Sequence, residues 1–293
     1  MTARPHAYVG RFAPSPTGSL HLGSLLAAVG SFVDARHHGG RWLVRMEDLD
    51  TPRVIRGCAD DMLRMLEAFA LHWDGTVEYQ SARTPHYRQA LEELTRRNLT
   101  FECSCTRQER LPHGGYPGTC RAGPRRSGPT ATRFRVGDER IEFADRIQGA
   151  CTFSLGQLGD VVVRRRDGVF AYQLAVVVDD ALQGVTHVVR GADLLDNTPW
   201  QLALQRALGL PVPGYAHLPL VVEAHRGKLA KSRRSLPVPA GNPGPLLHQV
   251  LTLLGQEPPA ELKAEPAESV LAWAAEHWRP GSMLGVREVP APP

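Results

Sequence analysis

The stretch RFAPSPTGSLHLGS, residues 11–24, constrains the fold more than any other part of the sequence. It predicts a strand at 8–12, then a loop with two prolines and a glycine, and then a helix that begins near His21. One face of this helix is apolar and suited to burial, with Leu22, Leu25, Leu26, Val29, Phe32 and Val33. Free N–H groups and the helix dipole favour negative charge at a helix start, so this junction is a candidate phosphate site.

The start of the helix reads His21-Leu22-Gly23-Ser24, which is neither a G-x-G-x-x-G sequence nor a Walker loop. The His21 imidazole can donate a hydrogen bond to a phosphate oxygen. Gly23 lets a flat group approach the backbone closely, because it has no side chain. His21 and Gly23 are therefore candidates for contacts with a nucleotide.

Composition fits a globular protein with a sizeable core, since 42% of the 293 residues are hydrophobic and 22% are charged. The sequence contains no run of 18 apolar residues, so it predicts no membrane span, and its N-terminus lacks the apolar segment of a signal peptide. We therefore expect a cytoplasmic protein, and a monomer. The net charge of +4 permits a nucleic-acid partner but does not by itself indicate one.

Strands and helices alternate through the first 100 residues, which predicts a parallel α/β sheet with ligands at the carboxyl ends of its strands. Residues 41–47 read as a strand, and Glu47 and Asp48 at its end are site candidates. Helices are expected around 62–73, closed by Trp73, and around 87–94. Further on, the expected elements are a buried strand or apolar helix at 169–180, a strand at 185–190, a helix capped by Thr198 that runs to Leu208, a strand at 218–223, and amphipathic helices at 246–254 and 270–278.

Residues 101–165 differ in character and predict an inserted α+β lobe, with strand-like pieces at 132–136, 141–143 and 160–166. Three of the five cysteines fall between 103 and 120, which indicates a metal site rather than disulfides. Tetrahedral zinc needs a fourth ligand, and chemistry alone favours His113 because imidazole is a common zinc ligand. The predicted divisions of the chain are 1–100, 101–165, 166–240 and 241–293.

Only three lysines accompany 31 arginines, and two of the three, Lys228 and Lys231, lie in a basic loop at 225–235. A lysine kept in a chain that otherwise uses arginine suggests that a compact, mobile charge is needed. Such charges can stabilise a triphosphate as its pyrophosphate leaves.

These motifs together resemble those of class I aminoacyl-tRNA synthetases of the glutamyl/glutaminyl branch. RFAPSPTG followed by His21-Leu22-Gly23-Ser24 is similar to the HIGH signature of that branch, and residues 228–232, KLAKS, are similar to its KMSKS signature, with Ala230 in place of the usual serine. The resemblance implies a Rossmann-like parallel nucleotide-binding core, an inserted zinc-containing α+β lobe and a short helical C-terminal extension.

The resemblance also assigns roles to residues. It implies His21 and Lys231 as catalytic residues, and His21, Gly23, Lys228 and Lys231 as the ATP site, with Mg²⁺ accompanying the ATP. The glutamate site that it implies consists of Arg11, Phe12, Ala13, Pro14, Ser15, Glu47, Tyr172 and Arg190. Arg11 can pair with a ligand carboxylate and Glu47 with the ammonium group. The implied ligands of one structural Zn²⁺ are Cys103, Cys105, Tyr116 and Cys120, with His113 as the alternative to Tyr116.

About 60 residues follow the lysine loop, fewer than the anticodon-binding region of an ordinary glutamyl-tRNA synthetase needs. Within the family, the chain therefore resembles the glutamyl-queuosine tRNA(Asp) synthetases. This implies L-glutamate, ATP and tRNA(Asp) bearing queuosine as partners. The alternatives are a minimal glutamyl-tRNA synthetase that charges the tRNA 3′ end and an inactive paralogue that only binds RNA.

Overall fold

The computed structural model describes residues 8–106, 109, 115–222 and 241–291. The elements of the first hundred residues are β1 (Val9–Phe12), α1 (Leu22–His37), β2 (Arg41–Met46), a 3-10 turn (Thr51–Arg53), α2 (Cys58–Ala68), β3 (Glu78–Tyr79), a 3-10 turn (Gln80–Arg83) and α3 (Thr84–Arg96). Strands β1, β2 and β3 pair in parallel in that order, as the alternation of elements predicts. The predicted position of Trp73 was wrong: α2 ends at Ala68, and Ala70 turns the chain with a φ of 53°.

The second half of the core contains α5 (Tyr172–Leu182), β9 (His187–Gly191), a 3-10 helix (Ala192–Asn197), α6 (Thr198–Leu208) and β10 (Gly214–Leu218). The apolar run that predicted either a strand or a helix is the helix α5, which is buried over most of its surface. Strands β9 and β10 are parallel, and β9 lies beside β1, where Thr186 N donates to the carbonyl of Val9 at 2.9 Å. The residue that precedes α6 is Asn197, so the predicted cap at Thr198 was one position late.

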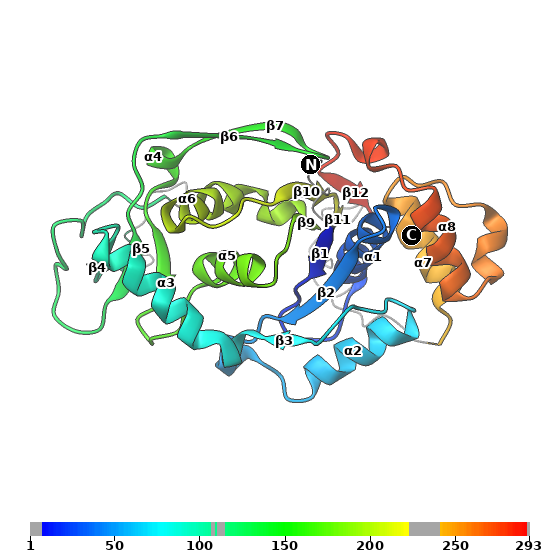
Figure 1. Ribbon diagram of the computed structural model, residues 1–293, viewed down its shortest axis with the longest axis horizontal. Helices are drawn as coiled ribbons and strands as arrows, with labels where there is room; N and C mark the ends of the chain where they lie inside the picture. Colours follow the sequence, from blue (N-terminus) through cyan, green and yellow to red (C-terminus); the bar gives the residue numbers. More distant parts are fainter. Residues whose placement is uncertain (1–7, 107–108, 110–114, 223–240, 292–293) are drawn as a thin grey trace, which may run out of the picture.

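The remaining strands form a lobe at one end of the elongated molecule and a long hairpin along one edge (Figure 1). Strands β4 (Thr100–Cys103), β5 (Ala131–Phe134) and β8 (Val161–Arg164) make a small antiparallel sheet. The hairpin consists of β6 (Arg140–Asp145) and β7 (Gly149–Ser154), followed by the short helix α4 (Leu155–Leu158). Strand β6 pairs in parallel with β10 at Asp145 and Tyr215, so the hairpin links the lobe to the core.

The C-terminal segment packs on α1 at the other end of the molecule (Figure 1). It contains α7 (Pro243–Leu253), a 3-10 helix (Ala260–Ala264), α8 (Ala267–Glu276), a 3-10 turn (Pro280–Met283) and β12 (Glu288–Pro290), which pairs with β11 (Leu220–Val222). Buried Asp34 of α1 holds it in place, since it accepts hydrogen bonds from Arg146 at 2.7 and 2.8 Å and from Trp278 Nε1 at 2.8 Å. Among the described residues, no helix combines the length and apolar character that crossing a membrane requires.

Candidate active site

The start of α1 has the geometry that the sequence predicts for an anion site. His21 is the N-cap residue, and its Nδ1 accepts a hydrogen bond from the backbone N–H of Ser24 at 3.2 Å. This bond places the ring proton on Nε2, which lies 3.1 Å from Ser24 Oγ. No acidic residue occupies the first turn, so the positive end of the helix dipole is not neutralised there. A Cβ at Gly23 would come within 3.3 Å of the His21 ring, so the glycine leaves room for the imidazole in this position.

A second group of polar residues consists of buried charges near the carboxyl ends of β1 and β2. Arg11 is 3% exposed, and its Nε donates to Asp180 Oδ1 at 3.3 Å. Arg45 is fully buried and donates to the same oxygen at 2.9 Å. Burial alone would raise the pKa of Asp180, but Arg11 and Arg45 hold that pKa below its usual range. One carboxylate therefore fixes two guanidinium groups.

Glu47 lies next to this group at the end of β2. Its Oε1 is 3.5 Å from Arg45 Nη2 and has no hydrogen-bond partner among the described residues. Burial raises the pKa of Glu47 to about 7, although Arg45 and Arg11 act in the opposite direction. A buried carboxylate oxygen without a partner is costly, so this position suits a cationic group of a ligand.

Tyr172 and Arg190 complete the set of predicted polar residues. Arg190 Nη1 donates to the Tyr172 hydroxyl at 3.2 Å. Burial raises the pKa of Tyr172, and the charges of Arg190, Glu47 and Arg11 also act on its hydroxyl. Four side chains that the sequence separates by up to 179 positions therefore lie around one centre.

The remaining predicted residues contribute in different ways. Ala13 is half-buried and Ser15 is exposed at the loop, while the carbonyl of Pro14 accepts a hydrogen bond from Glu47 N at 2.9 Å. The Phe12 ring packs into the core beside Trp42, so only its backbone is available to a ligand. Lys228, Lys231, Ala230 and His113 lie outside the described residues.

Sequence reasoning missed the acidic residues at the end of α5. Asp179 is fully buried and accepts hydrogen bonds from Arg83 at 2.6 Å, Tyr87 at 2.7 Å and Gln80 at 2.8 Å. It therefore holds α3 and the turn before it against α5, next to Asp180. The available signal was a pair of aspartates directly after an apolar run, because carboxylates buried in such a place need cationic partners.

A cleft of about 770 Å³ lies between α3, the small antiparallel sheet and the loop after β8. Leu49 and Thr51, which follow Glu47 closely, form part of its wall. Polar side chains line the cleft on two sides, with Arg88 on α3 and Arg164 on β8. Arg11, Glu47, Tyr172 and Arg190 are not among the residues that line this cleft.

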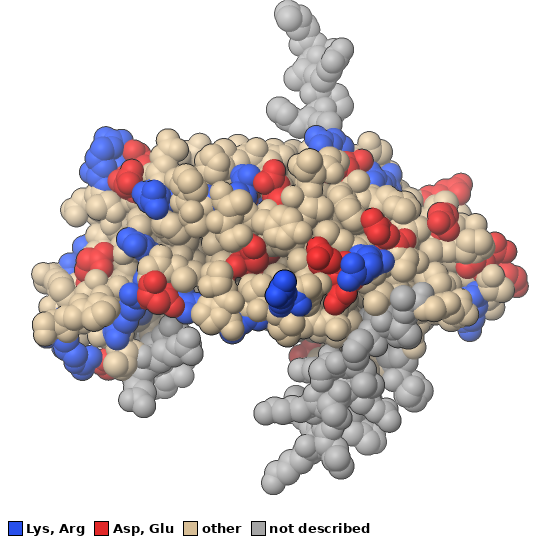
Figure 2. All heavy atoms as spheres, turned by 90° about the horizontal axis from the view of Figure 1, so that it is seen from below, with Lys and Arg blue, Asp and Glu red and all other residues tan. Residues whose placement is uncertain are grey.

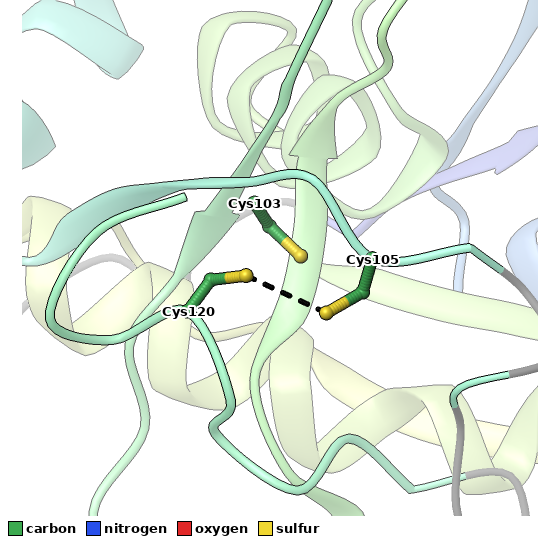
Figure 3. A group of neighbouring side chains, drawn as sticks. All are labelled: Cys103, Cys105 and Cys120. Carbon is green, nitrogen blue, oxygen red and sulfur yellow. Dashed lines mark hydrogen bonds between the residues drawn. The ribbon is translucent and has the colours of Figure 1, made fainter. Parts of the chain in front are cut away.

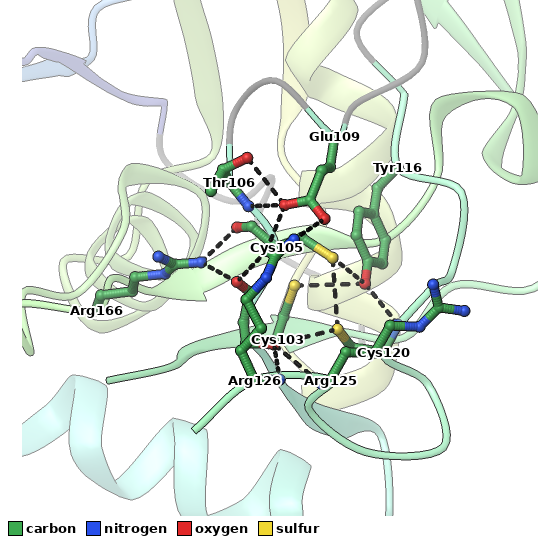
Figure 4. A network of polar contacts seen from close by, with 10 residues as sticks. Cys103, Cys105, Thr106, Glu109, Tyr116, Cys120, Arg125, Arg126 and Arg166 are labelled. Atoms are coloured by element: carbon green, nitrogen blue, oxygen red, sulfur yellow. Dashed lines mark hydrogen bonds and ion pairs between the residues drawn. The ribbon is translucent and has the colours of Figure 1, made fainter. Parts of the chain in front are cut away.

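The three clustered cysteines come together as the sequence predicts (Figure 3). Their sulfur atoms all lie within 4.8 Å of one another, with Cys105 Sγ 3.4 Å from Cys120 Sγ. The Tyr116 hydroxyl lies 3.4 Å from Cys103 Sγ and 3.7 Å from Cys105 Sγ (Figure 4). A tetrahedral zinc ion with bonds of about 2.3 Å separates its ligand atoms by roughly 3.8 Å. The spacing of these groups therefore suits a metal ion.

The loops around the cysteines are fixed by their own contacts. Ser104 Oγ accepts hydrogen bonds from the backbone N–H groups of Arg125 and Arg126, both at 3.0 Å (Figure 4). The Arg133 guanidinium lies 3.8 Å from the centre of the Tyr116 ring. Such support fixes the positions of the potential ligands before any ion is bound.

Gly159 is the residue of this lobe with the clearest steric requirement. Its φ is 73°, and a Cβ there would lie 2.4 Å from the carbonyl oxygen of Tyr116. We expect Gly159→Ala to lower the free energy of unfolding by about 1–3 kcal/mol through backbone strain. We also expect it to reduce the metal content of the purified protein. Thermal unfolding and metal analysis measure the two effects. Gly137→Ala is the matched control, since a Cβ there meets no atom closer than 3.9 Å; equal behaviour of the two variants would contradict the prediction.

Basic and acidic side chains both occur over the described part of the face shown in Figure 2, with acidic side chains more frequent at the right-hand end. No single-sign patch covers the described residues of this face. On this face, an RNA contact would therefore depend on local groups rather than on a broad basic surface.

Comparisons with known proteins identify the family of the chain. The family described as tRNA synthetases class I (E and Q), catalytic domain, matches residues 8–113 and 117–243. The chain is 52% identical to the glutamyl-Q tRNA(Asp) synthetase of Pseudomonas aeruginosa over 274 residues, which cover 93% of this chain and 94% of that protein. It is also 52% identical to the protein of the same name from Thiobacillus denitrificans, over 94% of both chains.

Solved structures share the fold. The crystal structure of a glutamate-tRNA synthetase from Elizabethkingia anophelis superimposes with a TM-score of 0.79 over 96% of this chain and 68% of that one, at 24% identity. The fold is thus the class I synthetase catalytic fold, built from mixed α/β sheets with parallel strands. The chain belongs to the class I tRNA synthetase family of glutamate and glutamine enzymes and, within it, to the glutamyl-Q tRNA(Asp) synthetases.

Proposed function

We propose that this chain activates L-glutamate with ATP and transfers the glutamyl group to the queuosine base in the anticodon loop of tRNA(Asp). One observation carries the proposal: Arg11, Glu47, Tyr172 and Arg190 lie close together, and β1, which carries Arg11, leads along the chain into a helix capped by a histidine. Two cations, one anion and one hydroxyl are the groups needed for a dicarboxylic amino acid. The names of relatives with about half of their residues identical support the same activity.

The first step forms glutamyl-adenylate. The α-carboxylate oxygen of glutamate attacks the α-phosphorus of ATP, and the bond from that phosphorus to the pyrophosphate oxygen breaks. His21 donates from Nε2 to a phosphate oxygen, Gly23 admits the nucleotide, and Lys228 and Lys231 neutralise the phosphates as pyrophosphate leaves. Mg²⁺ accompanies ATP as its usual counter-ion.

In the second step a hydroxyl of the queuosine cyclopentenediol attacks the activated carbonyl, and AMP leaves. The residues of this chain position the two reactants, so no covalent enzyme intermediate is needed. The cleft beside Leu49 and Thr51, with Arg88 and Arg164 in its walls, is proposed as a contact surface for the RNA. Residues 1–100 and 166–240 form the proposed catalytic core, with 101–165 as the inserted lobe and 241–293 as the extension.

We assign one structural Zn²⁺ to Cys103, Cys105, Tyr116 and Cys120, whose ligand atoms have the required spacing. Four protein ligands leave no open position, so this ion would stabilise the lobe and supply no Lewis-acid chemistry. Burial raises the pKa of the Cys105 thiol to about 11, so a bound cation would be needed to keep it as a thiolate.

Glutamate binding is expected to depend on pH through Glu47, whose buried carboxyl has a pKa of about 7. Below that pH the group is protonated and can no longer pair with the substrate ammonium. We expect the KM for glutamate to rise about tenfold between pH 8 and pH 6, while the KM for ATP changes little. In Glu47→Gln the KM should be high and nearly independent of pH. A flat pH profile in the unmodified chain would contradict this role.

The activity is tested by glutamate-dependent ATP–pyrophosphate exchange without tRNA, followed by transfer of labelled glutamate to tRNA(Asp) with and without queuosine. We expect exchange without RNA and labelling that requires queuosine. Glutamyl-tRNA synthetases as a family need tRNA before they activate glutamate, so exchange only with tRNA(Glu) would favour the minimal synthetase. A folded, zinc-loaded protein without exchange under any condition would favour an RNA-binding paralogue.

A further inference from the structure

Arg190 is held by an unusually complete set of contacts. It lies on β9, is 5% exposed, and donates through Nη2 to Thr198 Oγ1 at 2.9 Å and to the carbonyl of Leu194 at 3.3 Å. Its Nη1 donates to Tyr172, and its Nε donates to His217 Nε2 at 3.0 Å. Four of its five N–H groups thus have partners, and among the described residues one N–H on Nη1 is left for a ligand.

His217 determines the direction of this guanidinium from the neighbouring strand. It lies directly opposite Arg190 in the parallel pairing of β9 and β10 and has no exposed surface. An arginine can only donate, so Nε2 of His217 accepts and the ring proton is on Nδ1. That Nδ1 lies 2.6 Å from Asp145 Oδ2, the acceptor that this tautomer requires.

Asp145 is fixed in turn by the backbone at the end of β6. Its Oδ1 accepts three backbone N–H groups, those of Gln148 at 2.8 Å, Ile147 at 3.0 Å and His217 at 3.1 Å. Its Oδ2 faces only the imidazole in the described hydrogen bonds. The two oxygens are therefore distinguishable, and only Oδ2 selects the tautomer of His217.

We infer that Asp145 and His217 are positioning residues that orient Arg190 toward a carboxylate of the amino-acid substrate. The inference rests on the proposed function, in which Arg190 binds glutamate. A neutral imidazole between Asp145 and Arg190 aligns the guanidinium without a direct ion pair. Arg11, in contrast, pairs directly with Asp180. The charge of Arg190 thus stays available to the substrate, whereas that of Arg11 is partly offset.

The isosteric variant Asp145→Asn tests the inference. The three backbone donors retain the amide oxygen at the Oδ1 position, so the amide nitrogen replaces Oδ2 and donates to His217 Nδ1. The ring proton then moves to Nε2 and opposes the Arg190 N–H. We expect the KM for glutamate to rise tenfold or more, as for loss of a hydrogen bond to a charged group, with the KM for ATP unchanged. Nitrogen-15 NMR of labelled histidine should show the change of tautomer.

A matched pair at His217 provides a second test. His217→Gln can place its amide oxygen where Nε2 lies, so its KM for glutamate should stay within about threefold of that of the unmodified chain. His217→Asn is too short to reach Arg190 and should behave like Asp145→Asn. If the KM for glutamate and the KM for ATP changed equally in both His217 variants, His217 would have a structural role, and the inference would be overturned.

Arg190→Gln separates this inference from the proposed function. A higher KM for glutamate in Arg190→Gln, together with unchanged values in folded Asp145→Asn and His217→Asn, would overturn the positioning role alone. An unchanged KM in Arg190→Gln would remove Arg190 from the glutamate site and overturn the positioning role with it, whereas the proposed function fails only if glutamate-dependent exchange is absent. Urea unfolding of each variant verifies that the measured protein is folded.

Discussion

Replacing His21 by alanine should lower the rate of glutamate-dependent ATP–pyrophosphate exchange by about 10²–10³-fold, the usual effect of removing one donor to a developing negative charge. The ring is exposed at the start of α1, its Nδ1 is occupied by Ser24 N, and its Nε2 carries the proton. The loss should appear mainly in kcat, because the charge on the phosphates grows in the transition state.

His21 also caps a helix, so the variant His21→Asn is needed to separate the two roles. Asparagine caps a helix well and can accept the Ser24 N–H, but it cannot place a donor where Nε2 lies. We expect His21→Asn to unfold like the unmodified chain and to be nearly as slow as His21→Ala. His86→Ala, at an exposed position near the start of α3, is the control. Full activity in His21→Asn would show that the histidine acts only as a cap.

Local sequence patterns predicted the β1–α1 junction and the grouping of the three cysteines. A single stretch of chain determines the β1–α1 junction, because the spacing of its apolar residues predicts the helix and the histidine stands at the helix start. The cysteines are also close in sequence, so their clustering was visible. Chemistry alone favours His113 as the fourth ligand, whereas the family resemblance implies Tyr116. The Tyr116 hydroxyl lies beside two thiols, and His113 lies outside the described residues.

The supporting charges could not be predicted, because their partners are far apart along the chain. Arg11 and Asp180 are 169 positions apart, and Asp145 and His217 are 72 apart. Arg11 on β1 meets Asp180 on α5, and the pairing of β6 with β10 brings Asp145 to His217. Likewise, the apolar run before Asp180 has no clear period, since α5 is buried on nearly all sides, and periodicity cannot separate a buried helix from a buried strand.

The largest expected loss of stability comes from Asp180→Ala. Asp180 lies within 3.3 Å of Arg11 and 2.9 Å of Arg45, both almost fully buried. Removing the carboxylate leaves two guanidinium groups without their shared partner, and breaking a buried ion pair from one side costs about 3–5 kcal/mol. We expect urea unfolding to show a decrease of that size in the free energy of unfolding.

Two further variants show whether this decrease arises from buried charge. Asp180→Asn keeps the volume and one acceptor oxygen, so it should lose clearly less stability than Asp180→Ala while still weakening glutamate binding through a less constrained Arg11. Asp61→Ala removes the partner of Arg64 in an exposed pair and should change the free energy of unfolding by less than about 1 kcal/mol. If Asp180→Ala were as stable as Asp61→Ala, Arg11 and Arg45 would not need Asp180 for their burial. The fixed positions of these two guanidinium groups would then need another explanation. If Asp180→Ala unfolds as expected, the same carboxylate that stabilises the core also positions the groups that bind substrate.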